Sequence, residues 1–409
     1  MSIAPLPAFL VFASLGLVLY TYAGYPALLW LLARLLPSRE ADRGATAPRW
    51  PDVSVLLSAY NEELSIETRI RNLLELDYPA ERLEILVGSD GSTDRTEEIV
   101  RRWESDRLRL VAFAGRRGKA SVVNDLVSRA RGEIVVLTDA NTFFQPDAVR
   151  ELVRAFGRHP SACAVIGQVE YRTSAASGNL DGMYMRYDAW LQTLESRFGC
   201  VLGAHGAIYA FPRSRYRPIP AGTIIDDFQI PLRMRLHGGG HVFCAPAAKA
   251  WERSPERVRD EFRRRVRFGA GGLQALLSTW PLLLPWQGMA ALAYVSHKVL
   301  RWFGPWLILV GWGANLWLLG VPFFRMLFLS QLAGCGLALL APWVRRVPVV
   351  GRGAAALRYF LVLNAALLLG FVQFARGAAG PSWSRTPRQA NADGSPMRRG
   401  GAPAGTQAD

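Results

Sequence analysis

Apolar and polar positions follow two different patterns along the chain. Long apolar runs cover residues 9–36 near the beginning and 302–319, 323–343 and 357–374 near the end. A helix needs about 20 residues to cross a bilayer, and each run is close to that length. The part between them, 51–250, alternates short β-branched runs with amphipathic stretches. We therefore expect a globular domain between transmembrane helices.

The middle part alternates predicted strands with predicted helices. Four strands are expected at 53–60, 83–90, 108–113 and 132–139. Three amphipathic helices are expected at 65–76, 92–103 and 119–130. Such alternation produces right-handed crossovers and a mostly parallel sheet, so the fold class is α/β. Ligands of these sheets bind beyond the carboxyl ends of the strands, where this chain has polar loops.

These patterns divide the chain into four parts. We expect an N-terminal transmembrane anchor over 1–48, an α/β domain over 49–276, C-terminal membrane segments over 277–376 and a disordered tail over 377–409. The first apolar run is too long for the core of a signal peptide. Prolines and a glutamine interrupt 280–297, which favours an interfacial or re-entrant segment over a full span. The tail is rich in Gly, Ala, Pro and Arg, a composition typical of disorder.

The net charge of +15 limits the kinds of partner. A strongly basic balance favours nucleic acid, a membrane surface or phosphate-rich ligands. No nucleic-acid-binding motif is visible, so we expect a membrane and no nucleic acid. Arg34, Arg39 and Arg43 follow the first apolar run and place the globular domain in the cytoplasm by the positive-inside rule. Basic residues after Arg376 conflict with the simplest topology, so the number of spans and the side of the tail stay open.

The strand expected at 132–139 ends in a carboxylate that is followed closely by an amide. Asp139 and Asn141 are separated by one residue, so on an extended segment their side chains point the same way. Carboxylate and amide oxygens are hard ligands suited to Mg²⁺ or Mn²⁺. The four cysteines lack metal-ligand spacing, so zinc is not indicated. The alternative is a turn or helix cap made by Asn141 or Thr142, and this motif alone does not decide.

Four motifs occur in a fixed order, each after a strand or at the beginning of a helix. They are "SAYNEE" at 58–63, "SDGSTD" at 89–94, "GRRGKA" at 115–120 and "LTDANT" at 137–142. With these motifs the chain resembles the membrane-bound family 2 glycosyltransferases, which include cellulose, chitin, hyaluronan and poly-N-acetylglucosamine synthases. The resemblance covers about 53–274 and the flanking membrane helices. It implies a GT-A nucleotide-sugar-binding domain and a Mg²⁺ or Mn²⁺ cofactor, and it does not specify the substrate.

The first three motifs correspond to donor-binding positions of that family. Ala59, Tyr60 and Glu62 match the segment that packs around the nucleotide base. Asp90 matches the aspartate that contacts the base or ribose side. Lys119 matches a basic position beside the nucleotide. The resemblance therefore implies that these five residues bind the nucleotide-sugar.

The fourth motif corresponds to the family's metal motif, with one departure. Asp139 matches its first aspartate, and Asn141 stands where many members have a second aspartate. An asparagine keeps an oxygen ligand but removes a charge. The resemblance therefore implies that Asp139, which also belongs to the donor site, holds the metal with weaker help from Asn141.

Two later segments correspond to acceptor and catalytic positions. "GAHGAIYAF" at 203–211 resembles the glycine-containing segment near the acceptor, which implies roles there for His205 and Gly206. For His205 the alternative is that it only holds the loop. "TIIDDF" at 223–228 resembles the region of the general base, which by position is Asp227, and the neighbouring carboxylate of Asp226 favours its protonation. The alternative is that these aspartates cap a helix.

The arginine-rich stretch "RRRVRF" at 263–268 departs from the family pattern. Processive members carry Gln-x-x-Arg-Trp near this point, whereas here Arg264 replaces the glutamine and Phe268 replaces the tryptophan. The retained Arg267 would hold the departing diphosphate, with Arg264 also on the donor side. Phe268 would stack on an acceptor sugar. The departures leave open whether the enzyme is processive, and the outer arginines also suit an interfacial helix on anionic lipid.

Together these features predict an inverting, metal-dependent glycosyltransferase at the cytoplasmic face of a bacterial inner membrane. It would transfer a sugar, with UDP as the expected nucleotide, to a growing glycan or a lipid-linked acceptor in cell-surface polysaccharide synthesis, with export proteins as partners. One alternative is a single transfer onto a polyprenyl-phosphate carrier. Another is a non-catalytic sugar-binding subunit of an export complex. The sequence leaves the sugar, the linkage and the oligomeric state open.

Overall fold

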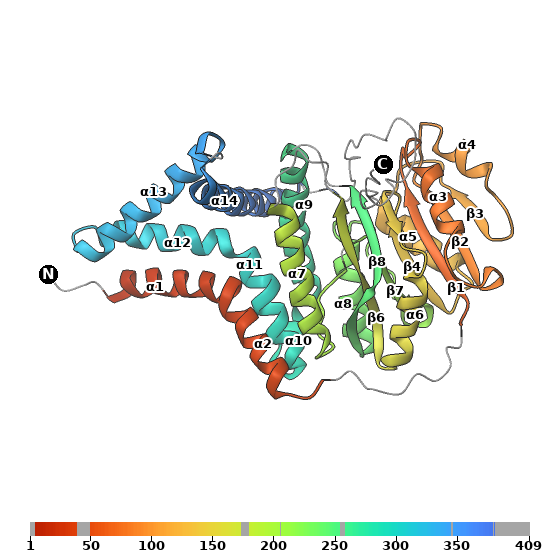
Figure 1. Cartoon of the computed structure of the whole chain (residues 1–409), viewed down its shortest axis with the longest axis horizontal. Coiled ribbons are helices and arrows are strands. Elements are labelled where there is room, and N and C mark those ends of the chain that lie inside the picture. Colours follow the sequence, from red (N-terminus) through yellow and green to blue (C-terminus); the bar gives the residue numbers. More distant parts are fainter. Residues whose placement is uncertain are drawn as a thin grey trace, which may run out of the picture.

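The computed structural model describes residues 5–38, 50–172, 180–204, 206–253, 258–344, 347–378 and 380. An α/β domain lies at one end of the molecule, and long helices from both ends of the chain lie together at the other end (Figure 1). The predicted arrangement of one sheet-containing domain with apolar helices before and after it is therefore confirmed.

The described strands form one eight-stranded sheet in the order β3-β2-β1-β4-β7-β6-β8-β5. Its strands are β1 (Val53–Ala59), β2 (Leu83–Ser89), β3 (Leu108–Ala112), β4 (Ile134–Asp139), β5 (Thr142–Phe144), β6 (Ala162–Arg172), β7 (Tyr209–Pro212) and β8 (His241–Arg253). The first four strands pair in parallel, as predicted. β7 runs antiparallel to β4 and β6, and β5 runs antiparallel to β8. The carboxyl ends of β1, β2 and β4 therefore lie at one edge, each followed by a polar loop.

Helices cover both faces of the sheet. They are α3 (Ile66–Leu74), α4 (Thr96–Arg101), α5 (Lys119–Arg129), α6 (Ala148–Arg158) and α8 (Asp226–Gly238). Alternate residues of β1 enter different cores: Val55 and Leu57 join the cluster under α3 and α6, whereas Leu56 joins the cluster under α5. A strand that is buried on both faces reads as a continuous apolar run, which is why β1 was predictable. The helix expected at 92–103 is shorter because 92–95 form a loop.

Three helices within the described residues are long and apolar enough to cross a membrane: Pro5–Leu35, Pro322–Val344 and Val349–Ala375. The first combines α1 (Pro5–Leu19), the π-helical turn η1 (Tyr20–Gly24) and α2 (Tyr25–Leu35). The other two correspond to α13 (Pro322–Val344) and α14 (Pro348–Ala375). Many of their apolar side chains are exposed, including those of Phe9, Leu339 and Val349. These surfaces suit lipid.

The fourth expected span, at 302–319, is wrong in length. The helix there, α12 (Gly304–Leu316), has 13 residues. At 1.5 Å per residue it is about 20 Å long, well short of a hydrocarbon core of about 30 Å. Hydropathy predicted a longer helix because the apolar composition continues through Trp317 and Leu318, which are in a turn.

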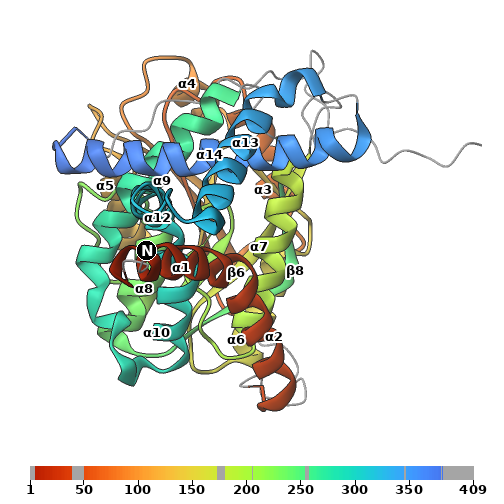
Figure 2. The same cartoon turned by 90° about the vertical axis from the view of Figure 1, so that its left-hand side faces the viewer.

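Two helices stand between the sheet and the apolar helices, namely α7 (Leu180–Ser196) and α9 (Val258–Thr279) (Figure 1). α14 crosses α9 (Figure 2). Their backbones touch there, since a Cβ added to Gly370 would lie 2.3 Å from the carbonyl oxygen of Val266. Small residues permit this close approach. α9 thus joins the α/β domain to a candidate span.

The stretch after α9 consists of short pieces. They are the 3₁₀ turns Trp280–Leu283 and Pro285–Gln287, α10 (Met289–Ala293), the π-helical turn η6 (Tyr294–Val299) and α11 (Leu300–Trp302). The remaining 3₁₀ turns are Ala80–Arg82 and Arg213–Arg215. The prolines expected to interrupt this stretch do so, because a proline lacks the N–H that continues a helix. An interfacial position for it stays a prediction.

Candidate active site

Three elements bring charged side chains together at the carboxyl edge of the sheet. Asp139 ends β4, Lys119 begins α5 and Asp226 begins α8. The Nζ of Lys119 lies 2.9 Å from Oδ1 of Asp139 and 3.2 Å from Oδ2 of Asp226. The sequence predicted all three residues but not this bridge, because nothing in a motif tells which strand end faces which helix start.

Asp227 lies next to this bridge and is only partly exposed. Its burial and the nearby carboxylate of Asp226 raise its pKa to about 6, and Asp139 adds to the shift. Lys119 and a backbone N–H from Gly206 oppose the shift without cancelling it. Burial alone would lower the pKa of Lys119, but the surrounding carboxylates outweigh burial and raise it. The site therefore pairs a permanent cation with a carboxyl group that ionises just below neutral pH.

Gly206 fits closely between two carboxylates. Its N–H donates to Oδ2 of Asp227 at 2.7 Å. A Cβ on this residue would lie 2.9 Å from that oxygen and 3.2 Å from Oδ2 of Asp139, so a side chain would press on both groups. The acceptor role predicted for Gly206 stays a prediction, and its N–H contacts the predicted base. His205, next to it, lies outside the described residues.

The capping alternative for Asp227 is also visible. Oδ1 of Asp227 accepts the N–H of Phe228 at 2.9 Å in the first turn of α8. The two oxygens thus have different partners, one in its own helix and one in the loop of Gly206. The first contact fixes the side chain, and the second directs it towards Asp139. Capping and a role as base are compatible.

A buried arginine contacts the end of β4 through a hydrogen bond. Arg69 on α3 is fully buried, and its Nη2 donates to Oγ1 of Thr138 at 2.8 Å. That hydroxyl donates to the carbonyl oxygen of Ala207, also at 2.8 Å, and so ties β4 to the loop of Gly206. The sequence analysis missed Arg69. The sequence did contain an indication of its burial. Arg69 lies on the same face of the predicted helix as the apolar residues Ile66, Ile70 and Leu73.

The loops after β1 and β2 are joined by hydrogen bonds. The amide of Asn61 accepts the N–H of Thr93 at 2.8 Å, and the N–H of Glu62 donates to Oγ1 of Thr96, also at 2.8 Å. Ser65 donates to the Glu62 carboxylate at 2.6 Å, which places Glu62 at the start of α3. Contact of Glu62 with a nucleotide therefore stays a prediction.

The other predicted donor residues have different surroundings. Asp90 is fully buried, and its two oxygens accept the N–H groups of Arg117 at 2.7 Å and Gly118 at 3.0 Å. It therefore shapes the loop that carries Lys119. Tyr60 is half-buried, with the Arg116 guanidinium 4.1 Å from its ring centroid, while Ala59 before it is buried. Their contact with the nucleotide stays a prediction.

Residues 140 and 141 form a turn after β4, so Asp139 and Asn141 do not lie on the extended segment that the sequence suggested, and their joint binding of a metal stays a prediction. No group of three or more His, Cys, Asp or Glu residues is placed to hold an ion within the described part of the chain. Mg²⁺ in such sites keeps several waters and binds one or two carboxylates together with substrate phosphates. Asp139 is partly exposed and already faces a cation, the Lys119 ammonium. These hard oxygen donors suit Mg²⁺ or Mn²⁺ bound together with a diphosphate.

The predicted residues on α9 lie in mixed surroundings. Arg267 is exposed, whereas Arg264 is half-buried with its guanidinium 5.9 Å from the ring centroid of Phe268. Phe268 is partly buried and packs against the apolar cluster that contains Phe228 and Trp302. Its ring is thus partly used in packing. Acceptor stacking by Phe268 and diphosphate binding by the two arginines stay predictions.

Comparison with known families identifies the class of protein. The family described as "Glycosyl transferase family group 2" matches residues 134–372, and "Glycosyl transferase family 2" matches 54–208. The first match covers more than half of the chain, so the chain belongs to glycosyltransferase family group 2. The predicted enzyme class, a glycosyltransferase, is thereby confirmed.

Several named proteins are similar to the chain. The poly-beta-1,6-N-acetyl-D-glucosamine synthase of Staphylococcus epidermidis is 27% identical over 238 residues, which cover 56% of this chain and 57% of that protein. The probable glycosyltransferase YdaM of Bacillus subtilis is 28% identical over 251 residues, which cover 56% of this chain and 59% of that protein. The chain thus matches little more than half the length of these relatives.

A solved structure is similar over almost the whole chain. It is the mannosyltransferase PcManGT from Pyrobaculum calidifontis in complex with GDP-Man and Mn²⁺, with a TM-score of 0.67 and 25% identity. The likeness covers 90% of this chain and 99% of that one. It confirms the predicted GT-A-type fold, and the candidate spans indicate association with a membrane.

Proposed function

We propose that the chain is an inverting glycosyltransferase that uses Asp227 as general base. The observation that carries this proposal is the convergence of Lys119, Asp139 and Asp226 beside a carboxyl group whose pKa is about 6. A base that ionises just below neutral pH is present in its active form in a cell and still accepts a proton readily. The hydrogen bond from the N–H of Gly206 holds the Asp227 carboxylate on the side that faces Asp139.

In this mechanism the reaction is a single displacement. Asp227 takes the proton of an acceptor hydroxyl while that oxygen bonds to the anomeric carbon of the donor. The bond from that carbon to the nucleoside diphosphate breaks on the opposite side, so the configuration inverts. Lys119 offsets negative charge at the edge of the sheet, and we place Arg264 and Arg267 on the diphosphate side. Mg²⁺ or Mn²⁺, held by Asp139 and Asn141, would stabilise charge on the departing diphosphate.

The acceptor defines two candidate activities. Similarity to poly-beta-1,6-N-acetyl-D-glucosamine synthases supports extension of a growing glycan from a UDP-sugar. Similarity over 90% of the chain to the mannosyltransferase PcManGT, which was solved with GDP-Man, supports transfer of a single sugar type from a nucleotide-sugar. The alternative activity is a single transfer onto a polyprenyl-phosphate carrier. We favour the first activity, in which the sugar is added to a growing glycan or a lipid-linked acceptor during synthesis of a cell-surface polysaccharide. Export proteins would then be partners of the enzyme.

We place the reaction at the cytoplasmic face of a bacterial inner membrane. Three candidate spans support the membrane, and Arg34 at the end of α2 supports the orientation. α9 brings the base-bearing helix α8 next to a candidate span, since it contacts both α8 and α14. This link between the base-bearing helix and a candidate span suits an acceptor that is held at the membrane.

The test is a donor screen with the full chain purified in detergent. UDP-N-acetylglucosamine, UDP-glucose and GDP-mannose would be offered with Mn²⁺, with Mg²⁺ or with a chelator, and product length would be read on a gel. We expect turnover with one donor, loss on chelation, and loss in Asp227→Asn. Glu67→Gln, which changes an exposed carboxylate on α3, should behave as the parent protein. Donor binding without turnover of any donor would instead support a non-catalytic sugar-binding subunit.

A further inference from the structure

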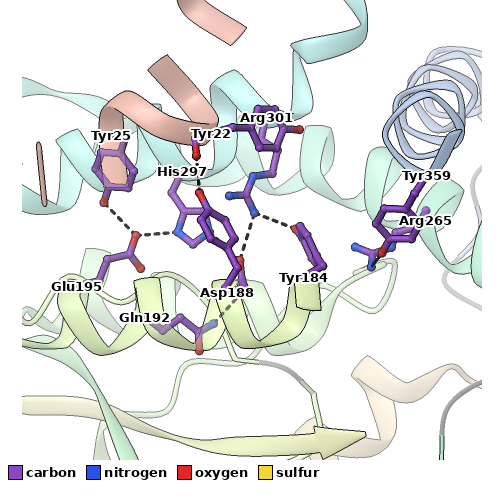
Figure 3. Close-up of polar contacts among 11 residues, drawn as sticks. Tyr22, Tyr25, Tyr184, Asp188, Gln192, Glu195, Arg265, His297, Arg301 and Tyr359 are labelled. Atoms are coloured by element: carbon purple, nitrogen blue, oxygen red, sulfur yellow. Dashed lines mark hydrogen bonds and ion pairs between the residues drawn. The ribbon is translucent and has the colours of Figure 1, made fainter. Parts of the chain in front are cut away.

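A second cluster of charged residues lies on the membrane side of the α/β domain, between η1, α7, η6 and α11 (Figure 3). His297 and Glu195 are fully buried, and Asp188 and Arg301 are 2% and 8% exposed. The proposed glycosyl transfer uses none of them. Buried charges are costly unless they are paired, so each group needs a physical reason to be there.

Most of the cluster is satisfied internally. Nδ1 of His297 lies 2.7 Å from Oε1 of Glu195, and Nε2 lies 3.0 Å from Oδ1 of Asp188. The hydroxyl of Tyr25 on α2 donates to the same Glu195 oxygen at 3.0 Å. This part of the cluster ties the N-terminal helices to α7, and its remaining Glu195 oxygen, Oε2, is buried with no hydrogen-bond partner among the described residues. A carboxylate oxygen repels an anion, so this part does not offer an anion site.

Arg301 is different because only part of its guanidinium has partners. Nη1 donates to the Tyr184 hydroxyl at 2.8 Å and to Oδ1 of Asp188 at 3.1 Å. Nε and Nη2 are buried and have no hydrogen-bond partner among the described residues. These two nitrogens form one edge of the guanidinium, where two parallel N–H groups point the same way. That edge matches two oxygens of a phosphate or carboxylate.

Aromatic rings and a second cation surround this edge. The ring centroids of Tyr22, Tyr184 and Tyr187 lie 5.5, 5.7 and 6.0 Å from the Arg301 guanidinium, and the three rings are only partly buried. On the other side, the Arg265 guanidinium lies 5.1 Å from the Tyr184 centroid. The guanidinium is thus surrounded by partly exposed tyrosine rings.

The position relative to the spans identifies the kind of ligand. Tyr22 belongs to the candidate span Pro5–Leu35, and Tyr359, which accepts a hydrogen bond from Arg265 at 3.3 Å, belongs to Val349–Ala375. Two of the four helical segments at the cluster, η1 and η6, are π-helical turns, which occur often at functional sites. An anionic group at this place would arrive from the membrane, where phosphate esters are the common anions.

We propose that Arg301 binds the phosphate ester of a membrane lipid through Nε and Nη2. Arg265 adds a second positive charge across the Tyr184 ring. The lipid is either a lipid phosphate that serves as acceptor or an ordinary anionic phospholipid, since both present the same chemistry. The proposal does not depend on the glycosyl-transfer mechanism, because it rests on the unsatisfied edge of Arg301.

The test measures lipid binding to the full chain in detergent by native mass spectrometry. Probes are a polyprenyl phosphate, phosphatidylglycerol, uncharged diacylglycerol and inorganic phosphate. Variants are Arg301→Gln, which removes the charge and the paired N–H groups, and Arg301→Lys, which keeps a charge beside Asp188 but loses the paired edge. Arg358→Gln is the matched control, since it removes an exposed arginine from α14 near Tyr359. Thermal unfolding shows which variants fold, and Arg301→Lys remains informative if Arg301→Gln does not.

We expect both Arg301 variants to lose at least about tenfold in affinity for a phosphate-bearing lipid, while Arg358→Gln and diacylglycerol binding stay unchanged. A loss confined to polyprenyl phosphate would assign the site to an acceptor, and an equal loss for phosphatidylglycerol would assign it to bulk lipid. Unchanged binding in Arg301→Lys would overturn the proposal, as would an equal loss in Arg358→Gln. Inorganic phosphate that binds as tightly as the lipids would overturn the assignment to a lipid.

Discussion

At the residue scale, the candidate active site depends on how the two oxygens of Asp227 are used. One accepts the N–H of Phe228 and the other accepts the N–H of Gly206. Both bonds stabilise the charged form, yet burial and Asp226 keep the pKa at about 6. The carboxyl group is therefore held in place without becoming too weak a base, which is the compromise that proton transfer requires.

The raised pKa of Asp227 predicts a pH dependence. A base acts only when ionised, so kcat/KM should rise about tenfold per pH unit below pH 6 and level off above it. Initial rates from pH 5 to 8, at fixed metal and donor, would measure this. Asp227→Asn should lower the rate at every pH. A profile in the parent protein that is flat between pH 5 and 7 would show that another group is the base.

The metal motif predicts unequal effects of its two residues. Asp139→Ala removes the charged ligand and a partner of Lys119, so it should abolish turnover. Asn141→Ala removes a neutral oxygen and should mainly raise the Mn²⁺ concentration for half-maximal rate, by about tenfold. Titration of Mn²⁺ against rate for both variants measures the difference. Equal losses at saturating Mn²⁺ would show that this division of labour is misassigned.

The space around Gly206 predicts a local steric effect. Gly206→Ala would place a methyl group against the carboxylates of Asp227 and Asp139, so we expect kcat to fall about a hundredfold, as a small misplacement of reacting groups can cause. The matched control is Gly222→Ala, because a Cβ there meets nothing within 4 Å. Rates and thermal unfolding would be measured together. Normal turnover in Gly206→Ala would contradict the close fit.

At the scale of elements, the long helix α9 fixes the entry to α8. Oε1 of Gln274 accepts the N–H of Ile224 at 2.9 Å and Nε2 of Gln229 at 3.2 Å, and its own Nε2 donates to the carbonyl oxygen of Gly222 at 2.8 Å. A single side chain thus clamps the loop before α8 and the first turn of that helix. Asp226 and Asp227 begin this turn, so α9 sets their position.

This clamp predicts a graded series of variants. Gln274→Leu removes all three hydrogen bonds and should lower kcat at least about tenfold and stability by about 1–3 kcal/mol. Gln274→Glu keeps the acceptor for Ile224 and loses the donor to Gly222, so its loss should be smaller. The measurement separates kcat from donor KM, which should change little. A rise in KM alone would mean that Gln274 acts on donor binding instead.

The elements differ in how well the sequence predicts them. β1, β2, β3 and β4 were predicted to within two residues because local periodicity and turn residues define them. The partners of β7 and β5 were not predictable, because antiparallel pairs across 70 or more positions leave no local pattern. The same holds within the site: motif order indicated Asp139 and Lys119 separately, and only the fold brings them within 2.9 Å.

At the scale of the whole molecule, the layer formed by α7 and α9 stands between the sheet and the apolar helices (Figure 1), and the described residues hold two separate clusters of charge. The first is at the edge of the sheet, around Asp139. The second is next to the spans, around His297 and Arg301. The domain and the spans are joined through this layer by packing of α9 on α14 and by the bond between Tyr25 and Glu195. Changes in the second cluster should therefore affect the assembly of the whole chain.

His297 provides the last prediction, because it separates two buried carboxylates. His297→Leu would leave Asp188 and Glu195 without the ring that hydrogen-bonds to both, and a buried acceptor that loses its partner costs about 1–3 kcal/mol. We expect a much lower thermal unfolding temperature in detergent. His237→Asn changes an exposed histidine on α8 and should leave that temperature unchanged. Because His297 on η6 contacts two carboxylates of α7, and one of them also accepts the Tyr25 hydroxyl, the variant should also release the N-terminal helices to protease before the sheet unfolds. An unchanged unfolding temperature in His297→Leu would mean that the two carboxylates are stabilised by other groups and that the cluster does not hold the two parts together.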